Sequence, residues 1–472
     1  MKTRILFLCI LIIMVTLANA QSTTLTLQQS IETALEHNIL TRQSELQMRN
    51  AEINYKQAKN NRLPVVESGY NYGFNSGRSI DPFTNGYINQ QLRSSSVNAQ
   101  AVVPVFKGFQ LKNSIRQNEL SFASATMEWQ QRKDELTLQV ILAWLQILSN
   151  EDALVLAKQQ AEVTSQQVKR LEIIATEGAT SPANVSDLKG QYAGDELAVI
   201  TAENNLFSSI VSFTQLLNIP YDTGLKIDRS GFNDTIKMYG ALPAEIYTTA
   251  LQKLASVKAI ELKVKTSAMA VSVAAAAFYP TVSLYGVLNT NYSSAAMLSK
   301  NLGYTELPGS DYVVVNGNSL PVITRQNKFS SQKINYSTQL NNNLASAYGV
   351  SVSIPLFNSF RTRSGVRLAK NEEKSNRLIA DNIKFQLRQA VEQAYINITT
   401  TYKRYTVLQS QAIAYAESFR IAGIRFENGV INSPEYLIAK NNVDRTNAAI
   451  ITTRYEYLLR MKVLDFYMGR LN

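Results

Sequence analysis

Two stretches of the chain keep a helical pattern of apolar and polar residues for far longer than an ordinary globular helix. Residues 109–177 contain neither Gly nor Pro and are rich in Leu, Gln, Glu, Lys and Ala, and Gly108 and Gly178 flank them. A second run without Gly or Pro, Val366 to Ala422, follows in the second half of the chain. At 1.5 Å per residue the first helix would be about 100 Å long, too long to bury within a compact domain. The pattern therefore predicts two very long helices, at 109–177 and 360–427.

Along the second long helix, apolar residues recur every three or four positions and form a narrow stripe. The stripe consists of Ile379, Ile383, Leu387, Val391, Ala394, Ile398, Tyr402, Tyr405, Leu408, Ala412, Tyr415 and Phe419. Gln, Asn, Thr, Arg and Glu occupy the other faces. A narrow stripe is typical of helices that pack on neighbours as a coiled coil, and not of helices buried on all sides.

Ahead of each long helix, the pattern changes to the two-residue period of β-strands. The alternating runs are 65–74, 97–106, 281–292 and 345–354. A loop rich in Gly, Ser and Asn is predicted between the first two, from Asn75 to Leu92. A longer loop of similar composition is predicted to extend to about Asn343. The sequence thus predicts two pairs of strands, at about 64–106 and 280–357.

The same order of elements occurs twice, which indicates an internal duplication. The first repeat, 21–240, has a helix, two strands, the long helix, a return helix at 183–217 and a linker at 218–240. The second repeat, 241–472, has the same order and ends with a return helix at 434–469. Matching pairs 216 residues apart include Pro64 and Pro280; pairs 251 apart include Pro104 and Pro355, Phe106 and Phe357, Phe109 and Phe360, and Gly178 and Gly429. The spacing changes only in the loop between the strands, where insertions are tolerated.

The first residues have the features of a secretory signal peptide, predicted at 1–20. Lys2 and Arg4 precede the apolar run Ile5 to Leu17, and Ala18-Asn19-Ala20 fits a cleavage site. About 13 apolar residues are too few to span a bilayer of about 30 Å. Cys9 is the one cysteine and lies within this segment, without the small preceding residues of a lipid-anchor site. The mature chain would therefore have no disulfide, catalytic thiol or Cys-bound metal.

Charge and hydropathy narrow the classes of protein further. The net charge of +11 falls to +9 without the signal peptide, but Lys and Arg are dispersed, so we expect no nucleic-acid partner. After residue 20, no run of 18 apolar residues predicts a transmembrane helix. An exported protein of this kind is periplasmic, secreted or inserted in a membrane as a β-barrel.

Four strands of about 10 to 14 residues are long enough to cross an outer membrane when tilted. Four strands cannot close a barrel, and lipid does not tolerate an open sheet edge. Several copies must then share one barrel. Three copies with 12 strands are favoured over two with 8, because side chains fill an 8-stranded barrel whereas a larger one can keep an aqueous lumen.

The sequence offers no catalytic, cofactor-binding or metal site. His37 is the single histidine, and with no cysteine in the mature chain it forms neither a catalytic triad nor a transition-metal site. No Gly-rich phosphate loop follows a strand. We therefore expect a protein that is not an enzyme and that uses no cofactor.

The sequence resembles the TolC-like outer-membrane efflux proteins. The resemblance rests on the opening segment 25–38, the Pro-x-Phe turns at Pro104 and Pro355, and the segment 425–437. It covers essentially the whole mature chain. It implies an α+β membrane protein: a homotrimer with a 12-stranded β-barrel in the Gram-negative outer membrane and a long α-helical coiled-coil barrel in the periplasm. It also implies docking to a periplasmic adaptor (membrane fusion protein) and an inner-membrane pump.

The resemblance also suggests where the periplasmic end would close and where the adaptor would bind. In this family, acidic residues narrow the pore just after the glycine at the helical tip of the second repeat. Here Glu435 takes the first acidic position, and Asn184 and Asp187 occupy the corresponding stretch of the first repeat. Ile438 stands where a second acid would be expected, and Glu435 has the alternative role of complementing a helix N-terminus. The candidate adaptor contacts are Gly178, Ala179, Thr180, Ser181, Pro182, Gly429, Val430, Asn432, Ser433 and Pro434.

These observations favour a passive outer-membrane duct of a tripartite efflux pump that exports small molecules or proteins. Energy would come from a partner. The alternative is a structural or adhesive protein, a periplasm-spanning coiled-coil rod that does not conduct.

Overall fold

The computed structural model describes residues 24–80, 85–89, 91–178, 180–221, 225–229 and 236–471. The predicted signal peptide at 1–20, Ala179 and parts of the predicted linker lie outside these residues. The chain divides into two compact units. The helical unit comprises Met1–Asn54, Gln117–Ala268 and Asn371–Asn472, and the strand unit comprises Tyr55–Arg116 and Met269–Lys370.

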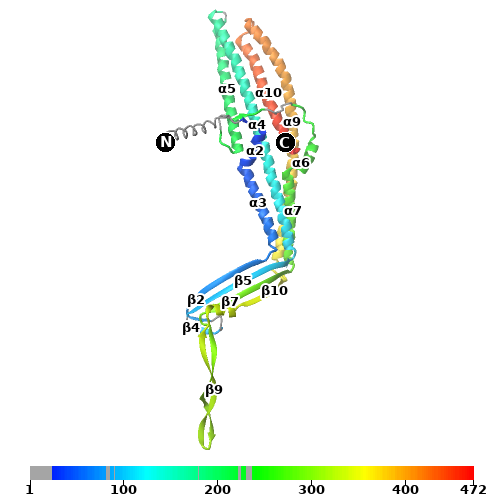
Figure 1. Ribbon diagram of the computed structural model, residues 1–472. Coiled ribbons are helices and arrows are strands. Elements are labelled where there is room, and N and C mark those ends of the chain that lie inside the picture. Colours follow the sequence, from blue (N-terminus) through cyan, green and yellow to red (C-terminus); the bar gives the residue numbers. More distant parts are fainter. Residues whose placement is uncertain are drawn as a thin grey trace, which may run out of the picture. The chain divides into compact units, whose positions relative to one another are not determined.

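Long helices dominate both halves of the chain. The first half has α2 (Leu27–His37), α3 (Ile39–Asn60), α4 (Gln110–Thr176) and α5 (Pro182–Leu217). The second half has α6 (Pro243–Lys253), α7 (Ala255–Ala275), the short 3₁₀ helix η1 (Ala276–Phe278), α8 (Tyr336–Asn342), α9 (Arg361–Glu427) and α10 (Ser433–Tyr467). Both α4 and α9 have 67 residues. In the helical unit α4, α5, α9 and α10 lie side by side (Figure 1).

The first helix of each half is broken at an equivalent position, which the sequence pattern did not predict. Asn38 ends α2 and Leu254 ends α6, each in an extended conformation. The N–H of Asn38 donates to Ala34 O, and that of Leu254 to Ala250 O. Both pairs are 216 residues apart, the spacing of the matched prolines. The break is therefore a feature that the two halves share.

The largest apolar core of the helical unit lies between α2, α4, α5 and α10. Trp144 and Leu148 of α4, Phe213 of α5 and Leu458 of α10 are almost completely buried there. Burial of one such side chain stabilises the fold by about 1.5–3 kcal/mol. The short strand β6 (Lys226–Ile227) pairs in parallel with β1 (Thr24–Leu25) and brings part of the predicted linker against this core.

By length and composition, α4 is the one described helix that is apolar enough to cross a membrane. Its most apolar part, 136–148, supplies seven residues to the core: Leu136, Val140, Ile141, Trp144, Leu145, Ile147 and Leu148. Packing within the protein therefore accounts for the apolar composition of this segment.

The apolar stripe of α9 is the protected side of that helix. Val391 and Ile398 are completely buried, beside Tyr457 and Leu464 of α10. The other stripe residues are half-buried, except Ile379, which is exposed. Apolar residues outside the stripe, such as Val407 and Ile413, are exposed. The single chain thus leaves apolar surface of α9 uncovered.

The strand unit is built on a four-stranded antiparallel sheet in the order β10–β7–β5–β2 (Figure 1). β2 (Val65–Asn75) pairs with β5 (Leu92–Lys107), β5 with β7 (Thr281–Ser293), and β7 with β10 (Ala345–Ser353). Each half of the chain contributes two strands. The β5–β7 register shifts between Pro104 and Phe106, where proline has no N–H to donate. Among the described residues, the edge strands β2 and β10 have no further strand beside them.

The two faces of this sheet differ in chemistry. The strand registers place Val66, Tyr70, Tyr72, Phe74, Val97, Leu284, Leu288, Tyr348, Val350 and Val352 on one side, here called the apolar face. They place Glu67, Asn71, Ser94, Ser96, Asn98, Gln100, Asn289, Asn291 and Ser351 on the other, here called the polar face. On the polar face, Gln100 Nε2 donates to Glu67 Oε2 over 3.0 Å. Most of the exposed large apolar side chains of the sheet therefore lie on the apolar face, whereas Val65, Val102 and Tyr285 are exposed on the polar face.

The structure corrects the prediction of a long loop before β10. β8 (Met297–Val315) and β9 (Asn318–Lys333) form a separate antiparallel hairpin. Asn316 and Gly317 have φ angles of 52° and 82°, as the common two-residue hairpin turn requires. The prediction was wrong because many Asn, Ser and Gly residues obscure the alternation, whereas pairing between the strands decides the conformation. The shorter predicted loop likewise contains β3 (Arg78–Ile80) paired with β4 (Tyr87–Asn89).

Candidate functional site

The candidate site lies at the turns that join α4 to α5 and α9 to α10, here called the first and second tips. Gly178 and Gly429 have φ angles of 72° and 69°, the left-handed conformation that glycine adopts after a helix. Ser181 Oγ accepts the N–H of Ala183, and Asn432 Oδ1 accepts that of Glu435. These caps satisfy N–H groups that a helix start leaves free. Each tip is therefore a defined turn between two long antiparallel helices.

All predicted contact residues except Ala179, which is not described, fall in or beside these turns. The first tip holds Gly178, Thr180, Ser181 and Pro182, and the second holds Gly429, Val430, Asn432, Ser433 and Pro434. Val430 is 62% exposed, whereas Ser433 is completely buried. Ser433 therefore belongs to the packing between the tips, and its side chain is not available to a partner.

Ser433 joins the two candidate gate residues of the first half. Its Oγ lies 2.6 Å from Asp187 Oδ2 and 2.9 Å from Asn184 Oδ1. Its backbone N–H also donates to Asn184 Oδ1 over 3.4 Å. Asn184 in turn donates to Thr180 Oγ1 over 3.2 Å. A compact polar contact thus links the first turn of α10 to that of α5.

The third candidate, Glu435, is not part of this contact. It is exposed in the first turn of α10, where a carboxylate interacts favourably with the positive end of the helix dipole. Ile438, one turn later, is 63% exposed. In a single chain, Glu435 therefore occupies a position that suits both helix stabilisation and a charged group directed to solvent.

An apolar cluster lies beside the tips and connects all four long helices. Val168 of α4, Leu188 of α5, Phe426 of α9 and Tyr436 of α10 are buried in it. Phe426 and Tyr436 stack with ring centroids 4.8 Å apart. Arg170 of α4 also forms an ion pair with Glu427 of α9. The two helical hairpins are therefore held together at this end by both apolar and charged contacts.

A buried charge cluster lies farther along the same helices. Lys440 of α10 is 2% exposed, and its Nζ lies 3.0 Å from Asp195 Oδ2 of α5 and 2.5 Å from Asp444 Oδ2. Thr164 of α4 donates to Asp195 Oδ2 and Gln191 to Asp195 Oδ1. Buried charges need this degree of pairing, because removing an ion from water costs several kcal/mol. No motif marked the cluster in the sequence; its one local signal is the Lys440–Asp444 spacing of four residues.

The cluster has one cation, Lys440, for the two carboxylates Asp195 and Asp444, and the pKa of Asp444 is shifted. Desolvation by burial raises the pKa of Asp444 above its usual value, and nearby Asp195 adds to the shift. The hydrogen bond and charge of Lys440 act in the opposite direction, as does a hydrogen bond from Gln160. Burial has the largest effect, so the pKa of Asp444 in the folded protein is raised above that of an exposed carboxyl group.

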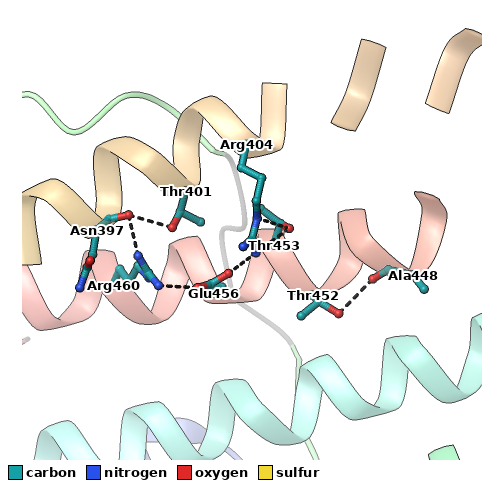
Figure 2. A network of polar contacts seen from close by, with 8 residues as sticks. All are labelled: Asn397, Thr401, Arg404, Ala448, Thr452, Thr453, Glu456 and Arg460. Carbon is teal, nitrogen blue, oxygen red and sulfur yellow. Dashed lines mark hydrogen bonds and ion pairs between the residues drawn. The ribbon is translucent and has the colours of Figure 1, made fainter. Parts of the chain in front are cut away.

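A second polar network joins α9 to α10 and is drawn in Figure 2. The guanidinium of Arg404 donates to Thr453 Oγ1 over 3.2 and 3.0 Å and pairs with Glu456. Arg460 pairs with the same carboxylate and donates to Asn397 O over 2.7 Å. This network connects the two helices of one hairpin, whereas the Lys440 cluster connects different hairpins.

Within the described residues, no group of three or more His, Cys, Asp or Glu side chains is placed to hold a metal ion. His37 Nδ1 lies 3.0 Å from Thr33 O, in the last turn of α2. This contact is structural.

Solved structures share this fold, although their sequences differ widely. A membrane protein from Pseudomonas aeruginosa has a TM-score of 0.75 at 16% identity, covering 94% of this chain and 92% of that chain. The CmeC outer membrane channel of Campylobacter jejuni has a TM-score of 0.75 at 14% identity, covering 94% and 85%. The outer membrane protein VceC of Vibrio cholerae has a TM-score of 0.73 at 13% identity, covering 94% and 95%. At such identities the likeness concerns the fold.

Curated proteins offer no match to this sequence. The match to a family is extensive: residues 30–218 and 246–470 fit the family described as outer membrane efflux protein. These ranges take in the long helices, the sheet and both tips. The resemblance expected from the sequence is thereby confirmed, and the chain belongs to the outer membrane efflux protein family.

Proposed function

We propose that the protein is a passive outer-membrane exit duct made of three copies of the chain. The observation that carries the proposal is the four-stranded sheet with two open edges, one apolar face and one polar face. In lipid, backbone groups at an open edge have no water to bond, so the sheet must close. Pairing β2 of one copy with β10 of the next would give a closed barrel of about 12 strands, wide enough for an aqueous lumen.

The chemistry of the sheet suits such a barrel. Tyr348 and Val350 on the apolar face are 89% and 60% exposed in the single chain, and lipid would cover them. Glu67, Asn98 and Gln100 on the polar face would line the lumen. Exposed apolar residues of α9 such as Val407 and Ile413 would be covered by helices of a neighbouring copy. Membrane and trimer together account for apolar surface that a soluble monomer would not retain.

We also propose that the chain arose by internal duplication into repeats 21–240 and 241–472. Three features support this. The long helices have equal length, the first helix of each half breaks at Asn38 or Leu254, and the residues before each long helix share an unusual backbone. Duplication of one unit would supply two strands and one helical hairpin per repeat.

The helical hairpins would form a periplasmic tube whose tips close and open the duct. Glu435 would contribute a ring of three carboxylates that attracts cations and repels anions, and the Ser433 contact with Asn184 and Asp187 would restrain the hairpins. The exposed parts of the tips would meet a periplasmic adaptor, and an inner-membrane pump would supply energy for the export of small molecules or proteins. This assignment of partners rests on family membership.

Single-channel recording of the purified mature protein in planar bilayers tests the proposal. We expect discrete conductance steps, more frequent openings in Ser433→Ala, and weaker cation preference in Glu435→Ala. Glu392→Ala is the matched control, because this exposed carboxylate lies in the middle of α9, away from the tips. A stable trimer that never conducts, even with both tip substitutions, would instead support a structural rod.

A further inference from the structure

The distal part of the β8–β9 hairpin exposes a concentrated set of apolar side chains. Its members are Tyr312, Val313, Val314, Val315, Leu320 and Ile323, each between 48% and 69% exposed. Four of them are consecutive in β8. Runs of this kind on a solvent-exposed strand are unfavourable unless another surface covers them.

Both faces of this part of the hairpin are apolar. The register pairs Val314 with Ser319 and Tyr312 with Pro321 on one face, and Val313 with Leu320 on the other. Between residues 307 and 324 the only charged residue is Asp311. Closer to the base of the hairpin, Arg325 pairs with Glu306 over 3.0 Å and lies over the ring of Tyr304. The distal part therefore lacks the charges that would select a charged ligand or an anionic surface.

The edges of the hairpin exclude a lipid surface as the partner. Among the described residues, β8 and β9 pair only with each other, so each has a free edge of backbone N–H and C=O groups. Such edges are not tolerated in hydrocarbon. Pro308 and Pro321 each remove one donor, but the run 312–315 contains no proline or lysine to block strand addition. A two-stranded hairpin is only marginally stable alone, so its edges call for further strands.

We infer that the hairpins of the three copies pair with one another along these edges and form a collar beyond the barrel. The inference rests on the proposed trimer. β8 begins at Met297, four positions after the last residue of β7, Ser293, so each hairpin is tethered to a strand of the proposed barrel. The trimer would hold three copies at a high effective concentration. Pairing β8 with the β9 of the next copy removes every free edge, as closure does in any barrel.

The collar would narrow the outer mouth of the duct. Six strands enclose less space than about 12, and the apolar face turned inward would oppose the passage of water and ions. The hairpin therefore becomes a candidate regulator of exit from the duct, distinct from the tips at the periplasmic end. No corresponding hairpin of this length occurs in the described part of the first half, where β3 and β4 have three residues each.

Thiol cross-linking of the full mature trimer tests the inference. Ser319→Cys is conservative and exposed, and its thiol would be the only one, because Cys9 lies within the predicted signal peptide. In the collar, the β9 strands of neighbouring copies lie two strand spacings apart, about 10 Å, which is too far for a disulfide. With a bis-maleimide that spans this distance we expect most of the protein to form covalent dimers, in a yield that does not change on dilution. Adding Val314→Lys, on the same face as residue 319, should reduce that yield by about tenfold, a change equivalent to about 1.4 kcal/mol.

The oligomeric state is measured in parallel by native mass spectrometry, which separates the two ways of failing. A trimer without cross-links, or with cross-links unaffected by Val314→Lys, overturns the collar and leaves the duct in place. Absence of a trimer overturns the proposed function itself. Cross-links formed in cell envelopes with a different protein, in place of cross-links between copies, would overturn the inference, because the hairpin would then bind another protein.

Discussion

At the residue scale, the junction between strand and long helix has the same unusual backbone in both halves. Gly108 and Phe109 have φ angles of 55° and 66°, and Ser359 and Phe360, 251 residues later, have 54° and 59°. A Cβ at Gly108 would lie 2.4 Å from Ala276 O, so glycine is required there for space as well as conformation. Ser359 is exposed, so its side chain meets no such clash, and only the left-handed backbone conformation is unfavourable there.

We predict opposite effects from substitutions at these two equivalent positions. Ser359→Gly should stabilise the protein by about 1 kcal/mol, because it relieves the left-handed strain. Gly108→Ala should destabilise it by about 3 kcal/mol, since it adds both strain and a clash. Thermal unfolding followed by circular dichroism measures both. A neutral Gly108→Ala substitution would show that this junction is not held as described.

Asp444 illustrates a residue whose charge depends on the fold. Burial raises its pKa above the usual 3.8. Because the folded pKa exceeds the unfolded one, this group's contribution to stability is complete below the unfolded pKa and is lost as the pH rises through the folded pKa. The loss should therefore occur as the pH rises from about 4 towards neutrality.

Asp444→Asn removes this titration and should make stability less dependent on pH. We expect the unfolding temperature of the unmodified protein to fall relative to the Asn variant between about pH 3 and about pH 7. The measurement compares the two proteins across that range in the same salt, with Asp195 and Lys440 intact in both. Parallel curves would contradict the assigned direction.

At the scale of elements, the large apolar core around Trp144 joins the helical hairpins, and a few specific contacts connect them toward the tips. The Lys440 cluster joins α10 to α5 and α4, the Ser433 contact joins the first turns of α10 and α5, and an apolar cluster lies between them. Beyond the core, these contacts hold the hairpins together at separate points. Removing one partner of a buried ion pair strongly destabilises the fold, because the remaining charge stays buried without a partner.

Lys440→Ala is therefore expected to destabilise the helical unit by about 3–5 kcal/mol. Arg388→Ala, which removes an exposed ion pair within α9, should change stability by no more than about 0.5 kcal/mol. Replacing Lys440, Asp195 and Asp444 together by Met and Leu should restore most of the loss, since no buried charge then remains. Denaturant unfolding compares all three proteins. Equal effects of the two single substitutions would mean that the cluster is hydrated.

At the scale of the whole molecule, three features of the single chain support the proposed trimer. Its sheet has two open edges and an uncovered apolar face, its α9 helix keeps exposed apolar residues, and its β8–β9 hairpin has no further strand among the described residues. All three features favour an assembly of several copies in a membrane. Each is unfavourable for one chain in water, and neighbouring copies or lipid would cover it.

Two adjacent residues of β10 test which face of the sheet would meet lipid and which would line the lumen in the proposed barrel. Val350→Lys places a charge on the apolar face and should cost up to about 2–4 kcal/mol in the membrane. Ser351→Lys places the same charge on the polar face and should be tolerated. Heat-resistant trimer in the outer-membrane fraction is the readout. If both variants assembled equally well, the assignment of the faces would be wrong.

The helices and strands differ in how well the sequence predicted them. The long helices were predictable because Gly and Pro are absent over long runs, and the strands β2 and β10 because large and small side chains alternate in them. The helix breaks at Asn38 and Leu254 were missed, since no glycine or proline marks them. The β8–β9 hairpin was missed because its turn-forming composition outweighed its alternation. The Lys440 cluster could not be predicted, because its partners come from three helices far apart in sequence.

The sequence by itself determined the features that depend on local order along the chain: helix length, strand period and the repeated order of elements. These follow from backbone propensity and periodicity, which act over a few neighbouring residues. Only the tertiary structure decided which charges meet, which apolar residues stay exposed and which strand edges stay open. Such features depend on contacts between segments distant in the chain. In this protein those contacts create the links between hairpins and leave open the strand edges on which the proposed trimer rests.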